Sequence, residues 1–197
     1  MGASGNFSKK IYLIRHGETE WTLSGQHTGI TDLPLTENGE RDAALIGKEL
    51  LPHKFKCILC SPLQRAKATC QKAGLFDQAV IEPLLKEWNY GIYEGKTTEE
   101  IHRENPGWTI FSKGAPRGES VADVSRRADE LLQKIAPIDG DIALFSHGHF
   151  LRVLAARWLC LPAEKGSLFS LSPSSVSILE FERSNPVIAL WNAKKLY

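Results

Sequence analysis

The sequence of 197 residues contains no apolar run of the roughly 20 residues that a membrane-spanning helix needs. It also lacks an excess of charge of either sign, because 24 lysines and arginines face 23 aspartates and glutamates, for a formal net charge of +1. Such a balance argues against a general attraction to nucleic acid or to an anionic membrane. The start, Met1-Gly2-Ala3-Ser4-Gly5-Asn6, has no hydrophobic signal region. We therefore expect a cytoplasmic protein with neither nucleic acid nor membrane as a partner.

Cysteine is also scarce, with four residues in the chain, and Cys57-Ile58-Leu59-Cys60 matches the C-x-x-C pattern of zinc and redox sites. This segment is apolar and typical of a strand, in which residues three apart point to opposite faces of the sheet. The sequence contains no second C-x-x-C to complete a metal site. We interpret these cysteines as structural thiols that pack like small apolar side chains.

The sequence does contain a regular alternation of strand-like and helix-like segments, which predicts an α/β fold with a mostly parallel sheet. The last two strands flank Ser184-Asn185-Pro186 and are expected to form a hairpin, which adds an antiparallel edge strand. Because 42% of the residues are hydrophobic and no linker or repeat is visible, residues 1–197 are expected to form a single domain. Strands are expected at about residues 9–14, 56–60, 79–82, 141–146, 175–183 and 187–192.

Two helices have clear signals. Residues 36–51 begin with Thr36 as an N-cap candidate and continue with an acidic first turn. The second helix follows Ser120, which with Asp123 resembles a capping box. Its apolar residues recur at helical spacing, which predicts an amphipathic helix with an apolar face made of Val121, Val124, Ala128, Leu131, Leu132 and Ile135.

Two of the expected strands end in a histidine. Ile11-Tyr12-Leu13-Ile14 leads directly into Arg15-His16-Gly17, and Ile142-Ala143-Leu144-Phe145 leads into Ser146-His147-Gly148-His149. Ligands of an open α/β sheet bind outside the carboxyl ends of its strands. We therefore predict that the two histidines share one pocket.

The residue types at these strand ends favour phosphoryl transfer. A neutral imidazole is a competent nucleophile near pH 7, and we assign this role to His16. Arg15 and Arg65 are expected to bind the phosphoryl oxygens bidentately, with protonated His147 as a third positive donor. Glu87 is the candidate acid for the leaving oxygen and the candidate base for water. This two-step scheme through a phosphohistidine requires no metal and no cofactor.

Four motifs carry a resemblance to a known family. They are Arg15-His16-Gly17-Glu18-Thr19, Ser61-Pro62-Leu63-Gln64-Arg65-Ala66, Glu87 with Tyr90-Gly91 and Glu94-Gly95, and Ser146-His147-Gly148. In this combination the chain resembles the histidine phosphatase superfamily, in its phosphoglycerate mutase-like branch. The resemblance implies a three-layer α/β/α sandwich, with His16 as the phosphorylated residue and Glu87 as the proton donor. Substrate contacts are expected from Gly17, Thr22, Gln26, Thr28, Gly29, Ser61, Tyr90, Gly148 and His149.

Within this family the loops look like those of the small sedoheptulose-bisphosphatase-type and acid-phosphatase-type members. The residues that carry this likeness are Ser24-Gly25-Gln26-His27-Thr28-Gly29, Glu87-Trp88-Asn89-Tyr90-Gly91 and the pair Trp108 and Phe111. The likeness favours a phosphomonoesterase that acts on a small phosphorylated metabolite, with sugar phosphates such as sedoheptulose 1,7-bisphosphate leading. Nucleoside monophosphates and a ribazole-type phosphate stay open as substrates.

Phosphoglycerate mutase is the alternative activity. Mutase-type members usually carry lysine where Thr98 falls here and asparagine where Thr22 falls, so both departures favour a phosphatase. The pair Arg126-Arg127 could match the arginines that bind the phosphoglycerate carboxylate, but we interpret it as part of the solvated face of the second helix. A catalytically inactive phosphate-binding scaffold is a further alternative, although every catalytic position holds a competent residue.

Three other features stay open. His27, His149 and Asp32, together with the two strand-end histidines, also allow a metal-hydrolase interpretation, against which the arginine pair argues by charge repulsion. The aromatic and irregular residues 88–117 suit either a pocket cover or a satellite core. The oligomeric state is open, with a two-fold homodimer as the general expectation for a soluble oligomer.

Overall fold

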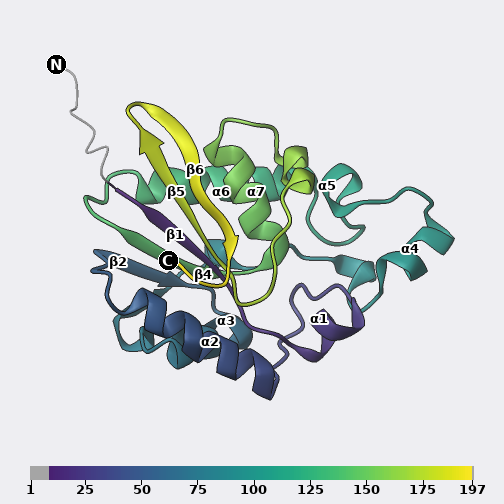
Figure 1. Cartoon of the computed structure of the whole chain (residues 1–197). Helices are drawn as coiled ribbons and strands as arrows, with labels where there is room; N and C mark the ends of the chain where they lie inside the picture. Colours follow the sequence, from purple (N-terminus) through teal and green to yellow (C-terminus); the bar gives the residue numbers. More distant parts are fainter. Residues whose placement is uncertain (1–8, 197) are drawn as a thin grey trace.

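The computed structural model describes residues 9–196 and has a six-stranded sheet at its centre, with helices on both faces (Figure 1). The strand order is β3-β2-β4-β1-β5-β6. The pairs β3–β2, β2–β4 and β4–β1 are parallel, while β5 is antiparallel to β1 and β6 is antiparallel to β5. The predicted mostly parallel sheet with an antiparallel edge is therefore confirmed. The strands are β1 (Ile11–Arg15), β2 (Cys57–Cys60), β3 (Ala79–Ile81), β4 (Ile142–Ser146), β5 (Val176–Glu182) and β6 (Asn185–Ala193).

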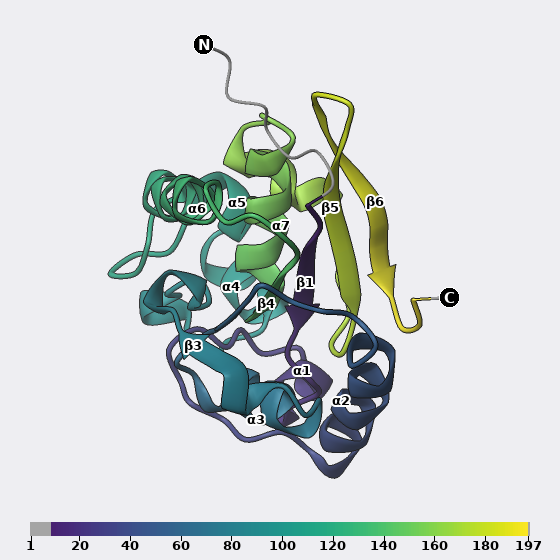
Figure 2. The same ribbon diagram turned by 90° about the vertical axis from the view of Figure 1, so that its left-hand side faces the viewer.

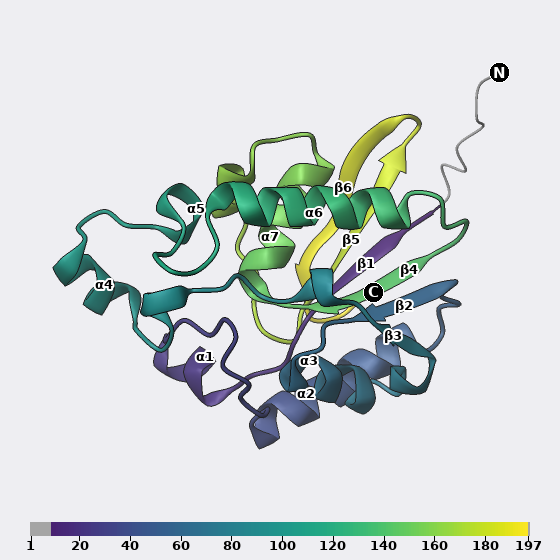
Figure 3. The same ribbon diagram turned by 180° about the vertical axis from the view of Figure 1, so that it is seen from behind.

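Four helices form the outer layers, as the views in Figures 2 and 3 show. Helices α2 (Glu37–Leu50) and α3 (Gln64–Lys72) cover one face of the sheet, and α6 (Val121–Ile135) and α7 (Gly148–Trp158) cover the other. Alternate residues of β1 point to opposite faces, so Leu13 joins one apolar cluster and Tyr12 joins the other. This arrangement confirms the three-layer α/β/α sandwich.

The remaining short elements lie in the connections. They are α1 (Glu20–Ser24), α4 (Thr98–Glu104), α5 (Ile110–Lys113), and the 3-10 helices η1 (Phe76–Gln78), η2 (Pro83–Leu85), η3 (Gly91–Tyr93) and η4 (Ala163–Leu168). Within residues 9–196, none of the helices combines the length and the apolar character that crossing a bilayer requires. The chain start on which the signal-region argument rests, residues 1–6, lies outside the described residues.

The predicted helix starts are present. Thr36 accepts a hydrogen bond from the backbone N–H of Gly39, and Ser120 and Asp123 form a reciprocal capping box at α6. At the other end of α6, the buried Lys9 ammonium donates to the carbonyl oxygens of Ile135, Ala136 and Ile138 at 2.8, 3.0 and 3.1 Å. A cation at this end complements the helix dipole, so Lys9 joins the start of β1 to the helix layer.

The cysteines of the C-x-x-C segment do point to opposite faces of the sheet, as predicted. Cys60 packs in the cluster of α2 and α3, whereas Cys57 packs against the other cluster. All four cysteines are free thiols. The two-face arrangement shows why this spacing on a strand cannot bring both thiols to one ligand.

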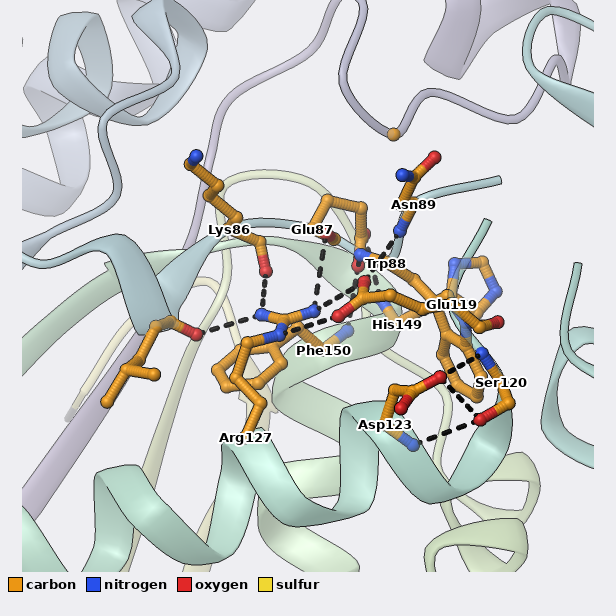
Figure 4. A network of polar contacts seen from close by, with 12 residues as sticks. Lys86, Glu87, Trp88, Asn89, Glu119, Ser120, Asp123, Arg127, His149 and Phe150 are labelled. Atoms are coloured by element: carbon orange, nitrogen blue, oxygen red, sulfur yellow. Dashed lines mark hydrogen bonds and ion pairs between the residues drawn. The ribbon is translucent and has the colours of Figure 1, made fainter. Parts of the chain in front are cut away.

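The prediction that Arg126 and Arg127 share a solvated face is correct for Arg126 and wrong for Arg127. The side chain of Arg126 is 73% exposed, whereas that of Arg127 is only 13% exposed. Arg127 is covered because α6 runs alongside residues 84–89, a segment remote in sequence, and its guanidinium hydrogen bonds to that backbone (Figure 4).

Candidate active site

The two strand-end histidines come together because β1 and β4 are neighbours. Arg15 and Ser146 are register partners, and the backbone N–H of His16 donates to the carbonyl of Ser146 at 2.9 Å. The rings of His16 and His147 lie 5.1 Å apart, centroid to centroid, and both residues are buried. Their separation is therefore set by the spacing of two central strands.

His16 has a defined tautomer. Its Nδ1 donates to the carbonyl oxygen of Gly17 at 2.7 Å, which leaves the lone pair on Nε2. Burial, aided by the charges of Arg65 and Arg15, holds the pKa of His16 well below its usual range. The ring is therefore a neutral imidazole near pH 7, with its nucleophilic nitrogen directed away from its own backbone.

The turn after His16 is tightly constrained. The backbone N–H of Gly17 donates to Thr69 Oγ1 at 2.9 Å, and a Cβ at position 17 would lie 2.6 Å from the carbonyl oxygen of Gly39. Only glycine allows this approach. Thr69 Oγ1 also donates to the carbonyl of Arg65, so one hydroxyl connects the turn to α3.

Arg15 is a cation with spare donors beside His16. Its NH1 donates to the carbonyl of Leu171, while its buried Nε has no hydrogen-bond partner among the described residues. Burial lowers the pKa of Arg15 to about 10, so the guanidinium stays charged near neutral pH. A buried donor without a partner is a place where an anionic ligand would be stabilised.

Arg65 lies fully buried behind this position. Its Nε donates to His147 Nδ1 at 3.1 Å, its NH1 to the carbonyl of Thr31 at 2.9 Å, and its NH2 to the carbonyls of Thr28 and Gly29 at 3.3 and 2.8 Å. These bonds use four of the five guanidinium N–H groups. Arg65 therefore holds the loop of residues 28–31 in place, and one of its N–H groups takes no part in these bonds.

The prediction of a protonated His147 is wrong for this arrangement. Arg65 Nε can only donate, so His147 Nδ1 accepts and the ring proton sits on Nε2, which pairs with Ser61 Oγ at 2.7 Å. Burial first, and then the charge of Arg65, holds the pKa of His147 well below its usual range. His147 is thus a neutral link between Arg65 and Ser61.

Glu87 approaches the site from the segment after η2 and is almost fully buried. Its Oε1 accepts from the backbone N–H groups of Trp88 and Phe150 at 2.8 and 2.9 Å, and its Oε2 accepts from that of His149 at 3.0 Å. Two of these donors belong to the first turn of α7, the positive end of the helix dipole (Figure 4). The position of the carboxyl group is therefore fixed by backbone.

Glu94 has a different role from Glu87, although both glutamates belong to the same sequence motif. Its Oε1 accepts from the backbone N–H groups of Gly29 and Thr31 at 2.8 and 3.0 Å. The same loop supplies carbonyl acceptors to Arg65. Glu94 thus holds the loop from its amide side while Arg65 holds it from its carbonyl side.

A cavity of about 180 Å³ opens in front of His16, Arg15 and Glu87. Of the predicted substrate contacts, Thr22, Gln26, Thr28, Tyr90 and His149 line it, together with Trp21, Gly25 and His27, which were not predicted as contacts. Gly17, Gly29, Ser61, Gly148, Arg65 and His147 are not among its lining residues.

The outer wall of the cavity is aromatic and uncharged near neutral pH. The rings of His27 and Tyr90 stack at 4.7 Å, and the hydroxyl of Tyr90 shares a hydrogen bond of 2.6 Å with His149 Nδ1. Burial lowers the pKa of His27 to about 4, with Glu94 partly opposing it, and holds the pKa of His149 well below its usual range. Burial also raises the pKa of Tyr90.

The segment of residues 88–117 contributes both to the main core and to the cavity wall. Trp88, Tyr90, Trp108 and Phe111 are buried in the main apolar cluster, and Tyr90 also lines the cavity. Its first part pairs with the loop at residues 26–27, where the N–H of His27 donates to the carbonyl of Lys96 at 2.9 Å. The insert therefore forms one wall of the cavity, and the satellite-core interpretation is wrong because its aromatic side chains join the main core.

The residues of the metal-hydrolase interpretation have other partners. His27 Nε2 pairs with Thr98 Oγ1 at 3.1 Å, and Asp32 accepts from the backbone N–H of Gln64 at 2.7 Å. Within residues 9–196, no three histidine, cysteine, aspartate or glutamate side chains are grouped so that they could hold a metal ion.

Comparison with known proteins agrees with this fold. The family model of the histidine phosphatase superfamily, branch 1, matches residues 11–194. An acid phosphatase of Mycobacterium tuberculosis is 41% identical over 177 residues, which cover 88% of this chain and 87% of the relative. The sedoheptulose 1,7-bisphosphatase of Saccharomyces cerevisiae is 32% identical, covering 81% of this chain and 71% of the relative.

A protein of Cronobacter sakazakii that is named for phosphoglycerate mutase (GpmB) is 30% identical, covering 92% of this chain and 89% of the relative. A solved structure of an open reading frame product from Mycobacterium tuberculosis has a TM-score of 0.88 at 38% identity, and covers 94% of this chain and 97% of that one. The chain therefore belongs to the histidine phosphatase superfamily. Its relatives place it among the phosphoric monoester hydrolases.

Proposed function

We propose that this chain is a metal-independent phosphomonoesterase that acts through a phosphohistidine at His16. The observation that carries the proposal is the tautomer of His16, because the Nδ1–H bond to Gly17 leaves a nucleophilic Nε2 lone pair in the cavity. Arg15, whose buried Nε has no hydrogen-bond partner among the described residues, lines the same cavity. This pairing of a neutral nucleophile with a fixed cation suits attack on a phosphate ester.

The reaction proceeds in two steps. His16 Nε2 attacks the phosphorus, the N–P bond forms, and the ester P–O bond breaks while protonated Glu87 gives its proton to the leaving oxygen. Water then attacks the phosphohistidine, loses a proton to the Glu87 carboxylate, and releases phosphate from His16. Arg15 and the remaining N–H of Arg65 stabilise the phosphoryl oxygens in both steps.

The cavity favours a small, uncharged leaving group such as a sugar. Its volume of about 180 Å³ is below the usual range of drug-sized sites, and stacked His27 and Tyr90 offer apolar faces with hydroxyl and imidazole hydrogen-bonding groups. Among the described lining residues Arg15 is the only cation. A sugar monophosphate therefore fits better than a substrate with a second anionic group, such as phosphoglycerate.

Because two relatives are named for sedoheptulose 1,7-bisphosphatase and phosphoglycerate mutase, the test must include sedoheptulose 1,7-bisphosphate and phosphoglycerates as alternative substrates. Phosphate release is measured with sugar phosphates, sedoheptulose 1,7-bisphosphate, phosphoglycerates and nucleotides, in the presence of EDTA, with His16→Ala as the blank. We expect turnover that survives EDTA and disappears in His16→Ala. Turnover retained by His16→Ala would overturn the mechanism, and transfer of phosphate between phosphoglycerates without release would favour the mutase.

Glu87→Gln tests the proton donor separately. The variant keeps the size of the side chain and removes the proton that the leaving oxygen needs. We expect it to slow alkyl phosphates far more than p-nitrophenyl phosphate, whose leaving group needs less protonation. Equal losses on both kinds of substrate would contradict the assignment of Glu87 as the acid.

A further inference from the structure

Two charged side chains outside the cavity, Arg127 and Glu119, surround the backbone that carries Glu87. Arg127 projects from α6 toward this segment, as Figure 4 shows. Its NH1 donates to the carbonyls of Leu84 and Lys86 at 2.8 and 2.6 Å, and its NH2 lies 3.4 Å from the carbonyl of Glu87 itself. Arg127 thus binds the chain immediately before the carboxyl group.

Glu119 binds the chain immediately after it. Its Oε2 accepts from the backbone N–H of Asn89 at 2.8 Å, its own N–H donates to the carbonyl of Asn89 at 2.9 Å, and its carbonyl accepts from the Trp88 indole at 2.9 Å. Glu119 and Arg127 also bind each other in a two-point pair, with Nε–Oε1 and NH2–Oε2 distances of 2.9 Å. The pair therefore binds the segment on both sides of Glu87, and we call Arg127 and Glu119 together the clasp.

The same guanidinium also contacts the element that holds the carboxyl group. Arg127 Cζ lies 4.4 Å from the centre of the Phe150 ring, and the backbone N–H of Phe150 donates to Glu87 Oε1. Arg127 thus touches both the main chain of Glu87 and the helix turn that binds its side chain.

This pair differs from an ordinary surface ion pair. The Arg127 and Glu119 side chains are only 13% and 23% exposed, whereas the neighbouring Arg126 and its partner Asp123 are 73% and 44% exposed. Exposed ion pairs contribute little to stability. A covered, two-point ion pair that also binds backbone groups fixes the position of that backbone. Arg126 provides a matched control one residue away on the same helix.

We propose that Arg127 and Glu119 are positioning residues that set the place of the Glu87 carboxyl group relative to the leaving oxygen. This inference rests on the role of Glu87 in the proposed function. His16 is carried by a central strand, so attack on phosphorus does not depend on this clasp. Loosening the clasp displaces the acid alone, and proton transfer is sensitive to displacements smaller than a hydrogen-bond length.

The test compares Arg127→Met and Glu119→Gln with Arg126→Met on two substrates, p-nitrophenyl phosphate and an alkyl phosphate such as glycerol phosphate. Positioned general acids contribute about 100-fold or more, so we expect a loss of about 10-fold or more in kcat for the alkyl phosphate. The kcat for p-nitrophenyl phosphate and both KM values should stay within about threefold of wild type, since binding and attack are unaffected. Arg126→Met should match wild type on both substrates.

A double variant separates positioning from a general structural effect. In a Glu87→Gln background there is no acid to misplace, so Arg127→Met should add no further loss that depends on the leaving group. Equal losses on both substrates, or a further selective loss in the Glu87→Gln background, would overturn the inference. Where Arg127→Met lowers folding yield, Glu119→Gln gives the same comparison with an isosteric side chain.

The outcomes also separate this inference from the function on which it rests. If Glu87→Gln shows the selective loss and neither clasp variant does, the positioning role fails while the proton donor stands. If Glu87→Gln itself loses both substrates equally, the proposed role of Glu87 fails, and the positioning role fails with it.

Discussion

Mild acid should destabilise the protein through the histidines around the cavity. Burial lowers the pKa values of His16, His27, His147 and His149 below the ordinary value of 6.5. The unfolded chain therefore binds more protons than the folded chain as the pH falls below about 6.5. Stability is fully present above that pH and decreases as the pH falls, until each folded-state pKa is passed.

The magnitude can be worked out for His27, whose folded-state pKa is about 4. Between an unfolded pKa near 6.5 and this value, the linkage relation predicts a loss of about 2 kcal/mol at pH 5 relative to pH 7.5. The loss from His27 is complete below about pH 4. His16, His147 and His149 act in the same direction, so the total loss is larger than that of His27 alone.

The measurement is urea unfolding at pH 7.5, 6.5, 5.5 and 5.0, followed by fluorescence, for the wild type, His27→Gln and Thr98→Val. His27→Gln removes the titrating ring and should reduce the difference between pH 7.5 and pH 5.0 by about 2 kcal/mol. Thr98→Val removes the hydrogen-bond partner of His27 but keeps the imidazole, so it should keep the pH dependence. A free energy of unfolding that does not change down to pH 5.0 would refute the reasoning, as would an unaltered slope in His27→Gln.

Three further changes test other contacts. Lys9→Met removes a buried ammonium from three carbonyls at the end of α6, and should lower the free energy of unfolding by about 1.5–3 kcal/mol in urea; no loss would mean that these bonds are replaced by water. Thr69→Val leaves the buried N–H of Gly17 without an acceptor, which should lower stability by about 1–3 kcal/mol in urea and reduce kcat, whereas unchanged kcat would contradict the role of Thr69 in holding the turn. Gly148→Ala places a Cβ 3.0 Å from Arg15 Cζ, so inhibition by inorganic phosphate should weaken without a large change in melting temperature; unchanged inhibition would argue against phosphate binding by Arg15.

The fold and the strand-end residues could be predicted because their signals are local. Strands β1 and β4 are buried on both faces, so each appears as an uninterrupted apolar run. The residue that follows such a run must lie at the edge of the sheet where ligands bind. His16 and His147 were therefore predicted together from two short segments that are 131 positions apart in the chain.

The protonation of His147 and the burial of Arg127 could not be predicted because they depend on remote partners. His147 is neutral since Arg65, 82 positions away, turns a donor toward it. Arg127 lies on the polar side of an amphipathic helix, and it is covered by residues 84–89, Glu119 and the Phe150 ring, which are brought to it by the fold. The places of Trp21 and Gly25 in the cavity wall could not be predicted either, because they depend on how the connection after β1 folds back.

The division of the site between strands and loops has a consequence for how its specificity can change. His16 directly follows a strand that is paired on both sides, whereas the wall that meets the leaving group is built from the connection after β1, with residues such as Trp21, Gln26 and His27. Replacements in this connection can reshape the wall while the spacing of the two central strands stays unchanged. Substrates with other leaving alcohols can therefore be accepted over evolutionary time, or in a library randomised at these three positions. The residues that act on the phosphorus atom need not change for this.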